Sequence, residues 1–378
     1  MPLDPTKAKR AWVMPWQTGW TTSVVWLDKN RVAAGNNHGQ IVVFQVPDEL
    51  PEKEAIEKGT KDEFAAVPLK PERLLSGHTN EIGDLAVTAD GKLVSCSYDH
   101  TLRVWDLSAA TEGTEKVEQY DERGKQRALK AGRTEEEVAV VEVPVQTECR
   151  KIEGHNPEWL RRLDMSADKS KLLSGDDSGL AILWDVANWS EIARVKNDVG
   201  WIRGLALSPD AKQAVTSNYG IRYSYFPSHI RLWDLETGKE SLELEKAAGG
   251  GNRGATPINA AAFSPDGKVV ALGKGGEDGG GALFLIQLDG FKKLHQLKGH
   301  TYGATHLRFT SDGKYLVSSG RDTLVIFWQV SDGKDVHTLG SGRGGQFKDW
   351  IHDFDFNPDE TRLAAADMAG MVHIWDFT

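Results

Sequence analysis

The chain has 378 residues, and its 55 acidic and 45 basic side chains give a formal net charge of −10. A hydrophobic content of 39% and a charged content of 26% exclude an intrinsically disordered chain. No apolar run reaches the roughly 20 residues of a membrane span, and the start lacks the apolar core of a secretory signal. The acidic balance disfavours non-specific nucleic-acid binding. We therefore expect a cytoplasmic protein with neither a membrane nor a nucleic-acid partner.

Three short patterns recur in a constant order along the chain. Tryptophan followed by aspartate or glutamine stands at 105–106, 184–185, 233–234, 328–329 and 375–376, at about one or two periods of roughly 40–50 residues. Gly-His pairs precede three of these, at 77–78, 154–155 and 299–300. Between them lie Asp-Gly-type turns at 87–92, 207–212, 263–268, 309–314 and 356–361. Alternating apolar residues around these turns predict a succession of β-hairpins.

This combination resembles the WD-repeat family over most of the chain. The resemblance implies an all-β fold, a seven-bladed β-propeller of four-stranded antiparallel blades, which we expect to form one domain over residues 1–378. The last unit ends at its third strand, so we predict that residues 9–15 pair antiparallel with 371–377 and close the ring. The expected blades run about 20–46, 71–107, 148–187, 191–236, 240–288, 292–331 and 335–378.

In this family a histidine, a serine or threonine, an aspartate and the tryptophan of one repeat form a buried hydrogen-bonded tetrad. The resemblance implies structural tetrads at His78, Ser95, Asp99 and Trp105, and at His300, Ser318, Asp322 and Trp328. In the third blade Ser178 stands where the aspartate is expected. Asp177, one position earlier, is expected to be less sensitive to replacement.

Two insertions interrupt the repeats, at about 47–70 and 108–144. The core of the second is charged, mixed in sign and poor in apolar residues, so we expect a solvated excursion, with a partner-docking element as the alternative. A shorter irregularity at 217–230 is expected to pack on its own blade.

Catalytic and metal-binding motifs are missing from the sequence. The glycine-rich stretches 273–281 and 340–345 open no predicted helix, so we interpret them as turns. The predicted inner strands contain mainly Gly, Ala, Leu and Ser. We therefore expect no enzymatic activity, no catalytic residue, no cofactor and no metal.

The residues that precede the inner strands face the top opening of a propeller, a surface that commonly binds peptides in this family. Alignment on the turns places four tryptophans at one equivalent position, with basic residues two positions later and further candidates before the tetrad aspartate. The predicted partner-binding residues are Trp20, Trp159, Trp201, Trp350, Tyr98, Tyr219, Arg161, Arg203, Arg321 and His352. The alternative is that each indole lies flat against the neighbouring blade and only fills space.

Three functions follow from these features. The first is a monomeric, non-enzymatic scaffold that binds a peptide or protein segment through tryptophan, tyrosine and arginine, which are frequent in interaction hot spots. The second is a small-ligand or catalytic site in the central funnel, which convergent carboxylates or histidines on the inner strands would favour. The third is a structural module of a larger assembly that uses the 108–144 excursion.

Overall fold

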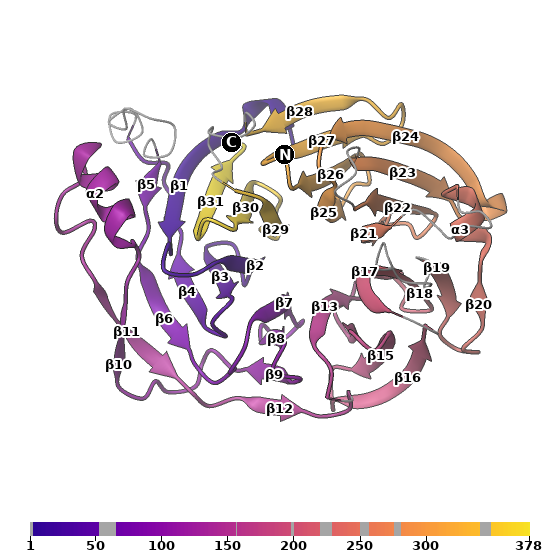
Figure 1. Ribbon diagram of the computed structural model, residues 1–378, viewed down its shortest axis with the longest axis horizontal. Helices are drawn as coiled ribbons and strands as arrows, with labels where there is room; N and C mark the ends of the chain where they lie inside the picture. Colours follow the sequence, from indigo (N-terminus) through magenta and orange to yellow (C-terminus); the bar gives the residue numbers. More distant parts are fainter. Residues whose placement is uncertain are drawn as a thin grey trace.

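Seven antiparallel four-stranded blades stand around a common axis in the computed structural model of the chain (Figure 1). The structure describes residues 3–52, 66–155, 157–197, 200–219, 229–249, 257–275, 281–340 and 349–378. The inner strand of each blade contacts the inner strands of both neighbouring blades, so the ring is continuous. The seven-bladed propeller expected from the sequence is therefore confirmed.

The strands of each blade follow one another from the axis outward. Blades one to three consist of β2 (Thr21–Trp26), β3 (Arg31–Asn36), β4 (Ile41–Gln45) and β6 (Pro71–Leu75); β7 (Ile82–Val87), β8 (Leu93–Ser97), β9 (Leu102–Trp105) and β12 (Arg150–Ile152); and β13 (Leu160–Met165), β14 (Lys171–Asp176), β15 (Leu180–Asp185) and β16 (Ser190–Lys196). Blades four and five consist of β17 (Trp201–Leu207), β18 (Gln213–Tyr219), β19 (Ile230–Asp234) and β20 (Glu240–Ser241); and β21 (Ile258–Phe263), β22 (Val269–Lys274), β23 (Gly281–Gln287) and β24 (Lys292–His300). Blades six and seven consist of β25 (Ala304–Phe309), β26 (Tyr315–Gly320), β27 (Val325–Gln329) and β28 (Asp335–Leu339); and β29 (Ile351–Phe356), β30 (Arg362–Asp367), β31 (Met371–Asp376) and β1 (Lys9–Pro15).

The blade boundaries expected from the repeats are wrong by one strand. The unit 71–107, for example, begins with β6, which pairs with β4 and so completes blade one. The same offset leaves the last unit without an outer strand. Each blade therefore takes its outer strand from the following repeat, which links neighbouring blades covalently as well as by packing.

The first strand of the chain supplies the missing outer strand of blade seven. Lys9 pairs with Asp376 and Pro15 with Met371 in antiparallel register, which confirms the predicted closure. The two ends of the chain consequently lie close together (Figure 1). Trp12 is buried in this strand, and the guanidinium of Arg362 lies 4.8 Å from the centre of its ring.

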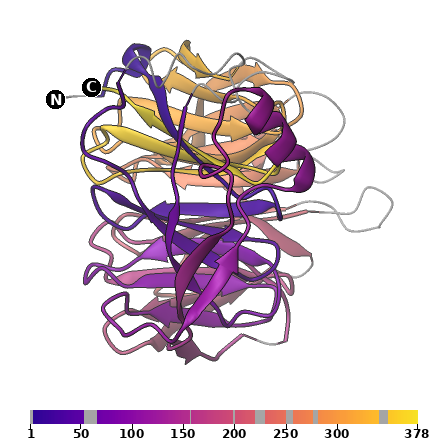
Figure 2. The same cartoon turned by 90° about the vertical axis from the view of Figure 1, so that its left-hand side faces the viewer.

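The excursion at 108–144 packs against the propeller through a few buried residues, so the expectation that it is only a solvated excursion is wrong. It contains β10 (Thr114–Val117), α2 (Glu122–Lys130) and the start of β11 (Val141–Gln146), which pairs in parallel with β6. In Figure 2, which shows the left-hand side of Figure 1, the hairpin of β10 and β11 and the helix α2 lie in front of the blades. The backbone of α2 is capped by Asp121, and its short residues Gly124 and Ala128 are buried. The charged residues of α2 therefore lie mainly on the side of the helix that faces solvent.

The insertion at 47–70 also reinforces the closure. Residues 53–65 lie outside the described part of the chain, but β5 (Val67–Pro68) pairs in parallel with β1. The amide of the buried Gln119 donates to the carbonyl of Leu69 at 2.7 Å. Both insertions therefore meet at the seam between blades seven and one.

The apolar core consists of layers between adjacent sheets. One such layer joins Val25 and Ala33 of blade one to Leu85 and Trp105 of blade two. Because a single sheet cannot bury both of its faces, each blade depends on its neighbours for stability. The short helix η1 (Pro5–Lys7) precedes β1, and the short helices α3 (Glu243–Ala247) and η3 (Asp289–Phe291) connect consecutive strands. None of the described helices is long and apolar enough to cross a membrane.

Most of the irregularity expected at 217–230 lies outside the described residues, as do residues 276–280 and 341–345 of the two glycine-rich stretches. The Asp-Gly turns follow the expected chemistry. Gly91 has a φ of +80°, which glycine adopts without strain, and the hydroxyl of Thr88 donates to Asp90 in the same turn. The equivalent turn of blade four places Ala211 at a φ of +57°.

Candidate interaction surface on the top face

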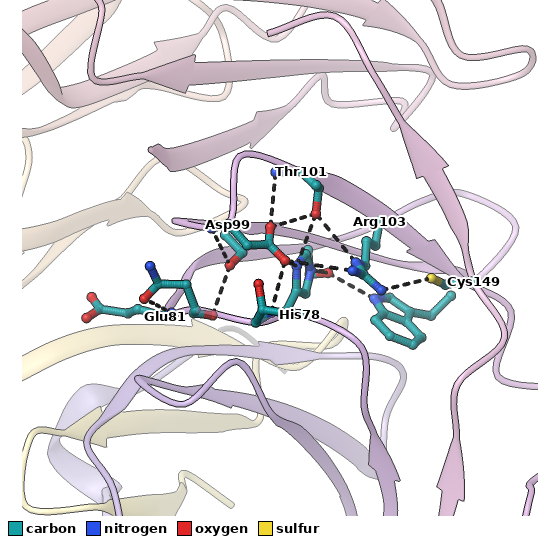
Figure 3. Close-up of polar contacts among 11 residues, drawn as sticks. His78, Glu81, Asp99, Thr101, Arg103 and Cys149 are labelled. Atoms are coloured by element: carbon teal, nitrogen blue, oxygen red, sulfur yellow. Dashed lines mark hydrogen bonds and ion pairs between the residues drawn. The ribbon is translucent and has the colours of Figure 1, made fainter. Parts of the chain in front are cut away.

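The tetrad of blade two fixes the segment that leads to the top of its inner strand (Figure 3). His78 donates from Nδ1 to Asp99 at 2.8 Å and accepts the hydroxyl proton of Ser95 at Nε2, 2.7 Å away. The indole N–H of Trp105 also donates to Ser95. Burial lowers the pKa of His78, so the imidazole is neutral and its single N–H points at the carboxylate. His300, Ser318, Asp322 and Trp328 form the same hydrogen bonds in blade six.

Blade three contains a tetrad that the sequence alignment missed. His155 contacts Asp176 at 2.7 Å and Ser174 at 2.7 Å, and Trp184 donates to Ser174. Asp176 stands two positions before Ser178, which occupies the slot of Asp99. The carboxylate therefore reaches the same imidazole nitrogen from the end of β14. An alignment by sequence position could not identify Asp176, because the hydrogen bond requires only that a carboxylate lie near the imidazole of His155.

Blade four replaces the missing histidine with an amide. The side-chain oxygen of Asn197 accepts from Thr216 at 2.9 Å, and the indole of Trp233 donates to the same hydroxyl. The network is thus shortened by one member but stays connected.

We expect Asp99→Ala, Asp176→Ala and Asp322→Ala each to lower the free energy of unfolding by about 1–3 kcal/mol, because each leaves a buried imidazole without its acceptor. Chemical denaturation measures these values. Ser178→Ala is the matched control and should cost less than about 1 kcal/mol. A loss at Ser178 equal to that at Asp176 would contradict the assignment of the blade-three tetrad. Asp177 accepts a hydrogen bond from Arg161, so its removal is no longer expected to be harmless.

The inner strands carry charged side chains as well as the Gly, Ala, Leu and Ser predicted from the sequence, so that prediction is wrong in this respect. The described inner strands bring carboxylates, histidines and arginines to the central axis: Asp84, Arg162, Asp164, His306, Arg308, Asp353 and Asp355. Their alternation with apolar residues along each strand is the signal that could have revealed them. No set of three or more His, Cys, Asp or Glu side chains in the described ranges is arranged to hold a metal ion.

These carboxylates join neighbouring blades through the backbone. Asp84 accepts from the backbone N–H of Leu163 in the next blade at 3.0 Å. Asp164 likewise accepts from Leu207 at 2.7 Å. Burial and the proximity of the two carboxylates raise the pKa values of Asp84 and Asp353. The axial charges therefore already have partners within the fold, which favours a structural role over catalysis.

Arg162 crosses the axis. Its guanidinium donates to the carbonyl of Arg203 at 3.2 Å in blade four and to that of Thr305 at 3.3 Å in blade six. One side chain thus links three blades and fills the centre of the ring near the top.

The pH dependence of stability should change when Asp164 is replaced by asparagine. Burial raises the pKa of Asp164 from 3.8 to about 7, so the folded chain holds this proton more tightly than the unfolded chain. The resulting stabilisation is full below about pH 4 and is lost as the pH rises through 7. Between pH 5.5 and pH 8 the wild-type protein should therefore lose about 2 kcal/mol relative to Asp164→Asn. Urea unfolding of both proteins at both pH values checks this; a constant difference between them would contradict it.

Four tryptophans stand at the start of inner strands that run in the same direction, Trp201 as the first residue of β17 and the other three directly before their strands. They therefore lie on one face, here called the top face. Trp20, Trp159 and Trp201 are 52%, 43% and 37% exposed, whereas Trp350 is half-buried. Residues of this size are usually buried. Three indoles at one end of the axis are therefore available to a partner.

The largest aromatic group spans blades two, three and four. Trp159 stacks on Tyr98 with ring centres 5.0 Å apart and planes 2° apart. Arg161 lies 4.6 Å from the ring centre of Tyr98 and 5.8 Å from that of Trp201, and donates to Tyr98 and to Asp177. Burial raises the pKa of Tyr98 to about 12, so the phenol stays protonated. Trp159 thus lies flat on the neighbouring blade and is exposed as well, which combines the two alternatives for the indoles.

The opposite side of the mouth repeats the pairing of arginine with tryptophan. The guanidinium of Arg321 lies 4.7 Å from the ring centre of Trp350. On the inner strand of blade seven, the Nδ1–H of His352 donates to the carbonyl of Thr22 at 3.0 Å. Burial, reinforced by Arg162, lowers the pKa of His352 to about 4, so this ring is neutral. Tyr219 ends β18 opposite Trp201 in register, and its side chain lies outside the described part.

Known proteins share this repeat. Residues 69–106, 146–185, 291–329 and 333–376 match the family model described as WD domain, G-beta repeat. The U3 small nucleolar RNA-associated protein 15 homologs of Xenopus laevis and Xenopus tropicalis are 25% and 24% identical over 57% of this chain and 38% of each relative. The Apoptotic protease-activating factor 1 of Mus musculus is 22% identical over 76% of this chain and 25% of that protein. The alignments thus span well under half of each of these relatives.

Proposed function

We propose that this seven-bladed β-propeller, whose repeats match the WD domain, G-beta repeat model, acts as a non-enzymatic scaffold that binds a peptide or protein segment on its top face. The exposure of Trp20, Trp159 and Trp201 around one mouth is the observation that carries the proposal. Propellers built from this repeat typically serve as protein-interaction scaffolds. Exposed tryptophan, tyrosine and arginine are also the residue types that contribute most to binding energy at protein interfaces.

The arrangement of the indoles suits an extended segment. Trp159 and Trp201 belong to adjacent blades three and four, and Trp20 and Trp350 belong to adjacent blades one and seven. The two pairs face each other across the mouth, so a segment can lie between them. The half-buried indole of Trp350 and the stacked indole of Trp159 are held in place, which reduces the entropy cost of binding.

For Arg161 we propose a different role from the one predicted above. The sequence analysis placed it among the residues that contact the partner. Its guanidinium instead lies against Asp177 and Tyr98 of this chain. We therefore assign Arg161 to holding the aromatic group together, and we assign direct contact with the partner to the exposed indoles.

The test is the double variant Trp201→Ala with Trp350→Ala. Partner binding should weaken at least tenfold, or about 1.4 kcal/mol, because both anchors are lost while the tetrads and the closing strand stay intact. A partner is first identified by pull-down with the wild-type chain. Calorimetry then measures its affinity for both proteins, and circular dichroism checks that the double variant is folded. Ile192→Ala on β16 is the control, since this residue is 48% exposed on the outer strand of blade three and should not matter. Full binding by the folded double variant would contradict the proposal.

A second function rests on the folded excursion at 108–144. Its outer strand β10 pairs on one edge with β11, and its described residues include exposed charged side chains on α2. We propose it as a further contact of a larger assembly.

The Xenopus relatives are named for association with a small nucleolar RNA, which makes a nuclear assembly the alternative to the cytoplasmic location. A fluorescent fusion of the full-length chain separates the two locations.

A further inference from the structure

Basic groups converge at the centre of the top mouth. His352 of blade seven lies within electrostatic reach of Arg162, Arg203 and Arg321, which come from blades three, four and six, and all three arginines disfavour its protonation. Two of these guanidinium groups stack on the indoles of the proposed binding surface. Arg203 lies 5.3 Å from the ring centre of Trp201, and Arg321 lies 4.7 Å from that of Trp350.

The cations near the mouth are unevenly balanced by carboxylates. Arg161 is paired with Asp177, and Arg162 lies near the axial carboxylates Asp84 and Asp353. Among the described residues, Arg321 forms no ion pair with a carboxylate. Burial, reinforced by repulsion from Arg161, lowers the pKa of Arg203 to about 10, although Tyr98 and Asp177 act in the opposite direction.

Stacking occupies the face of a guanidinium and leaves its N–H edge for hydrogen bonds. Arginine donors match the planar or tetrahedral oxygens of carboxylate and phosphate in paired hydrogen bonds. An anion placed between Arg203 and Arg321 would relieve the repulsion within the cluster, and a half-buried position strengthens its attraction.

We infer that the centre of the mouth is an anion subsite, in which Arg203 and Arg321 bind a carboxylate or phosphate group of the segment that docks on the indoles. This inference rests on the proposed function and gives the chemistry of the partner: a segment with an acidic or phosphorylated residue between apolar ones. Trp201 and Trp350 support the two guanidinium groups and at the same time provide the apolar walls. A lysine or arginine at the central position of the segment is rejected.

The experiment uses four immobilised pools of degenerate octapeptides whose fixed central residue is glutamate, phosphoserine, serine or lysine. The full-length protein is passed over each pool, and the amount retained is measured. We expect at least tenfold greater retention on the glutamate or phosphoserine pool than on the serine pool, and the least on the lysine pool. The two acidic pools distinguish a carboxylate from a phosphate ligand. Retention should fall steeply with added salt, because the contacts are ionic.

The variants Arg203→Gln and Arg321→Gln should each reduce retention on the preferred acidic pool at least tenfold. Arg194→Gln removes an exposed arginine paired with Glu191 on the outer strand of blade three and should change nothing. Circular dichroism confirms that each variant is folded. Equal retention on acidic and neutral pools, or unchanged retention by both arginine variants, would overturn the inference.

The same pools separate this inference from the proposed function. If retention is lost with Trp201→Ala and Trp350→Ala but is insensitive to the arginines and to the central residue, the mouth binds peptides without an anion subsite. If the tryptophan variant is retained on every pool as strongly as the wild type, both the proposed binding surface and the anion subsite are contradicted.

Discussion

Deleting residues 1–15 is expected to lower the free energy of unfolding by more than about 5 kcal/mol, which leaves little of the 5–15 kcal/mol typical of a folded domain. The deletion removes β1 and the buried Trp12 and Met14, and it exposes the outer edge of β31. Replacing one buried tryptophan by alanine costs about 3–5 kcal/mol by itself. The exposed edge also invites pairing with a second chain, so we expect aggregation. Differential scanning calorimetry and light scattering measure the two effects.

Point variants separate the loss of the strand from a general effect of truncation. Trp12→Ala should cost about 3–5 kcal/mol in the full-length chain. Lys9→Ala at the exposed start of the same strand should change stability by less than about 0.5 kcal/mol. An unchanged melting curve after the deletion would show that the ring closes without β1.

Replacing residues 111–136 with a short Gly/Ser link is expected to lower the free energy of unfolding by about 3 kcal/mol or more. The replacement removes the buried Tyr120, whose burial contributes on the order of 2 kcal/mol, and the apolar face of α2. It also removes Gln119, which leaves the carbonyl of Leu69 without its donor at a further cost of about 1–3 kcal/mol. The shortened loop itself changes the entropy only slightly.

Limited proteolysis and urea unfolding test this second expectation. The wild-type excursion should resist cleavage because its backbone is hydrogen-bonded and packed. Arg123→Ser with Arg127→Ser on the exposed side of α2 is the control, and it should cost less than about 0.5 kcal/mol per site. A loss below 1 kcal/mol on replacing the excursion would mean that its docking contributes nothing to the stability of the propeller.

The repeats in the sequence determined the fold class, the number of blades and the closure by residues 9–15. A turn, an alternating strand and a tryptophan recur with one period, and the resemblance of these repeats to the WD-repeat family implies the propeller. A unit that ends one strand short then requires a partner strand from elsewhere. The tetrad members of blades two and six were implied by the same resemblance, because these two repeats carry all four residues at the family's positions. The equivalent positions of Trp20, Trp159, Trp201 and Trp350 came from the same alignment.

Contacts between distant segments were decided only by the tertiary structure. Asp176 completes a tetrad from another position because the imidazole requires a carboxylate within reach, whatever its place in the repeat. The charged excursion folds because Ala128 of α2 packs with Tyr120 and Val138 of the same segment, and because Gln119 finds an acceptor, the carbonyl of Leu69, at the seam between blades seven and one. The cluster of Arg203 and Arg321 around His352 joins three blades, and no local pattern records that proximity. Composition describes what a segment presents to water, whereas the site depends on which blades the closed ring brings face to face.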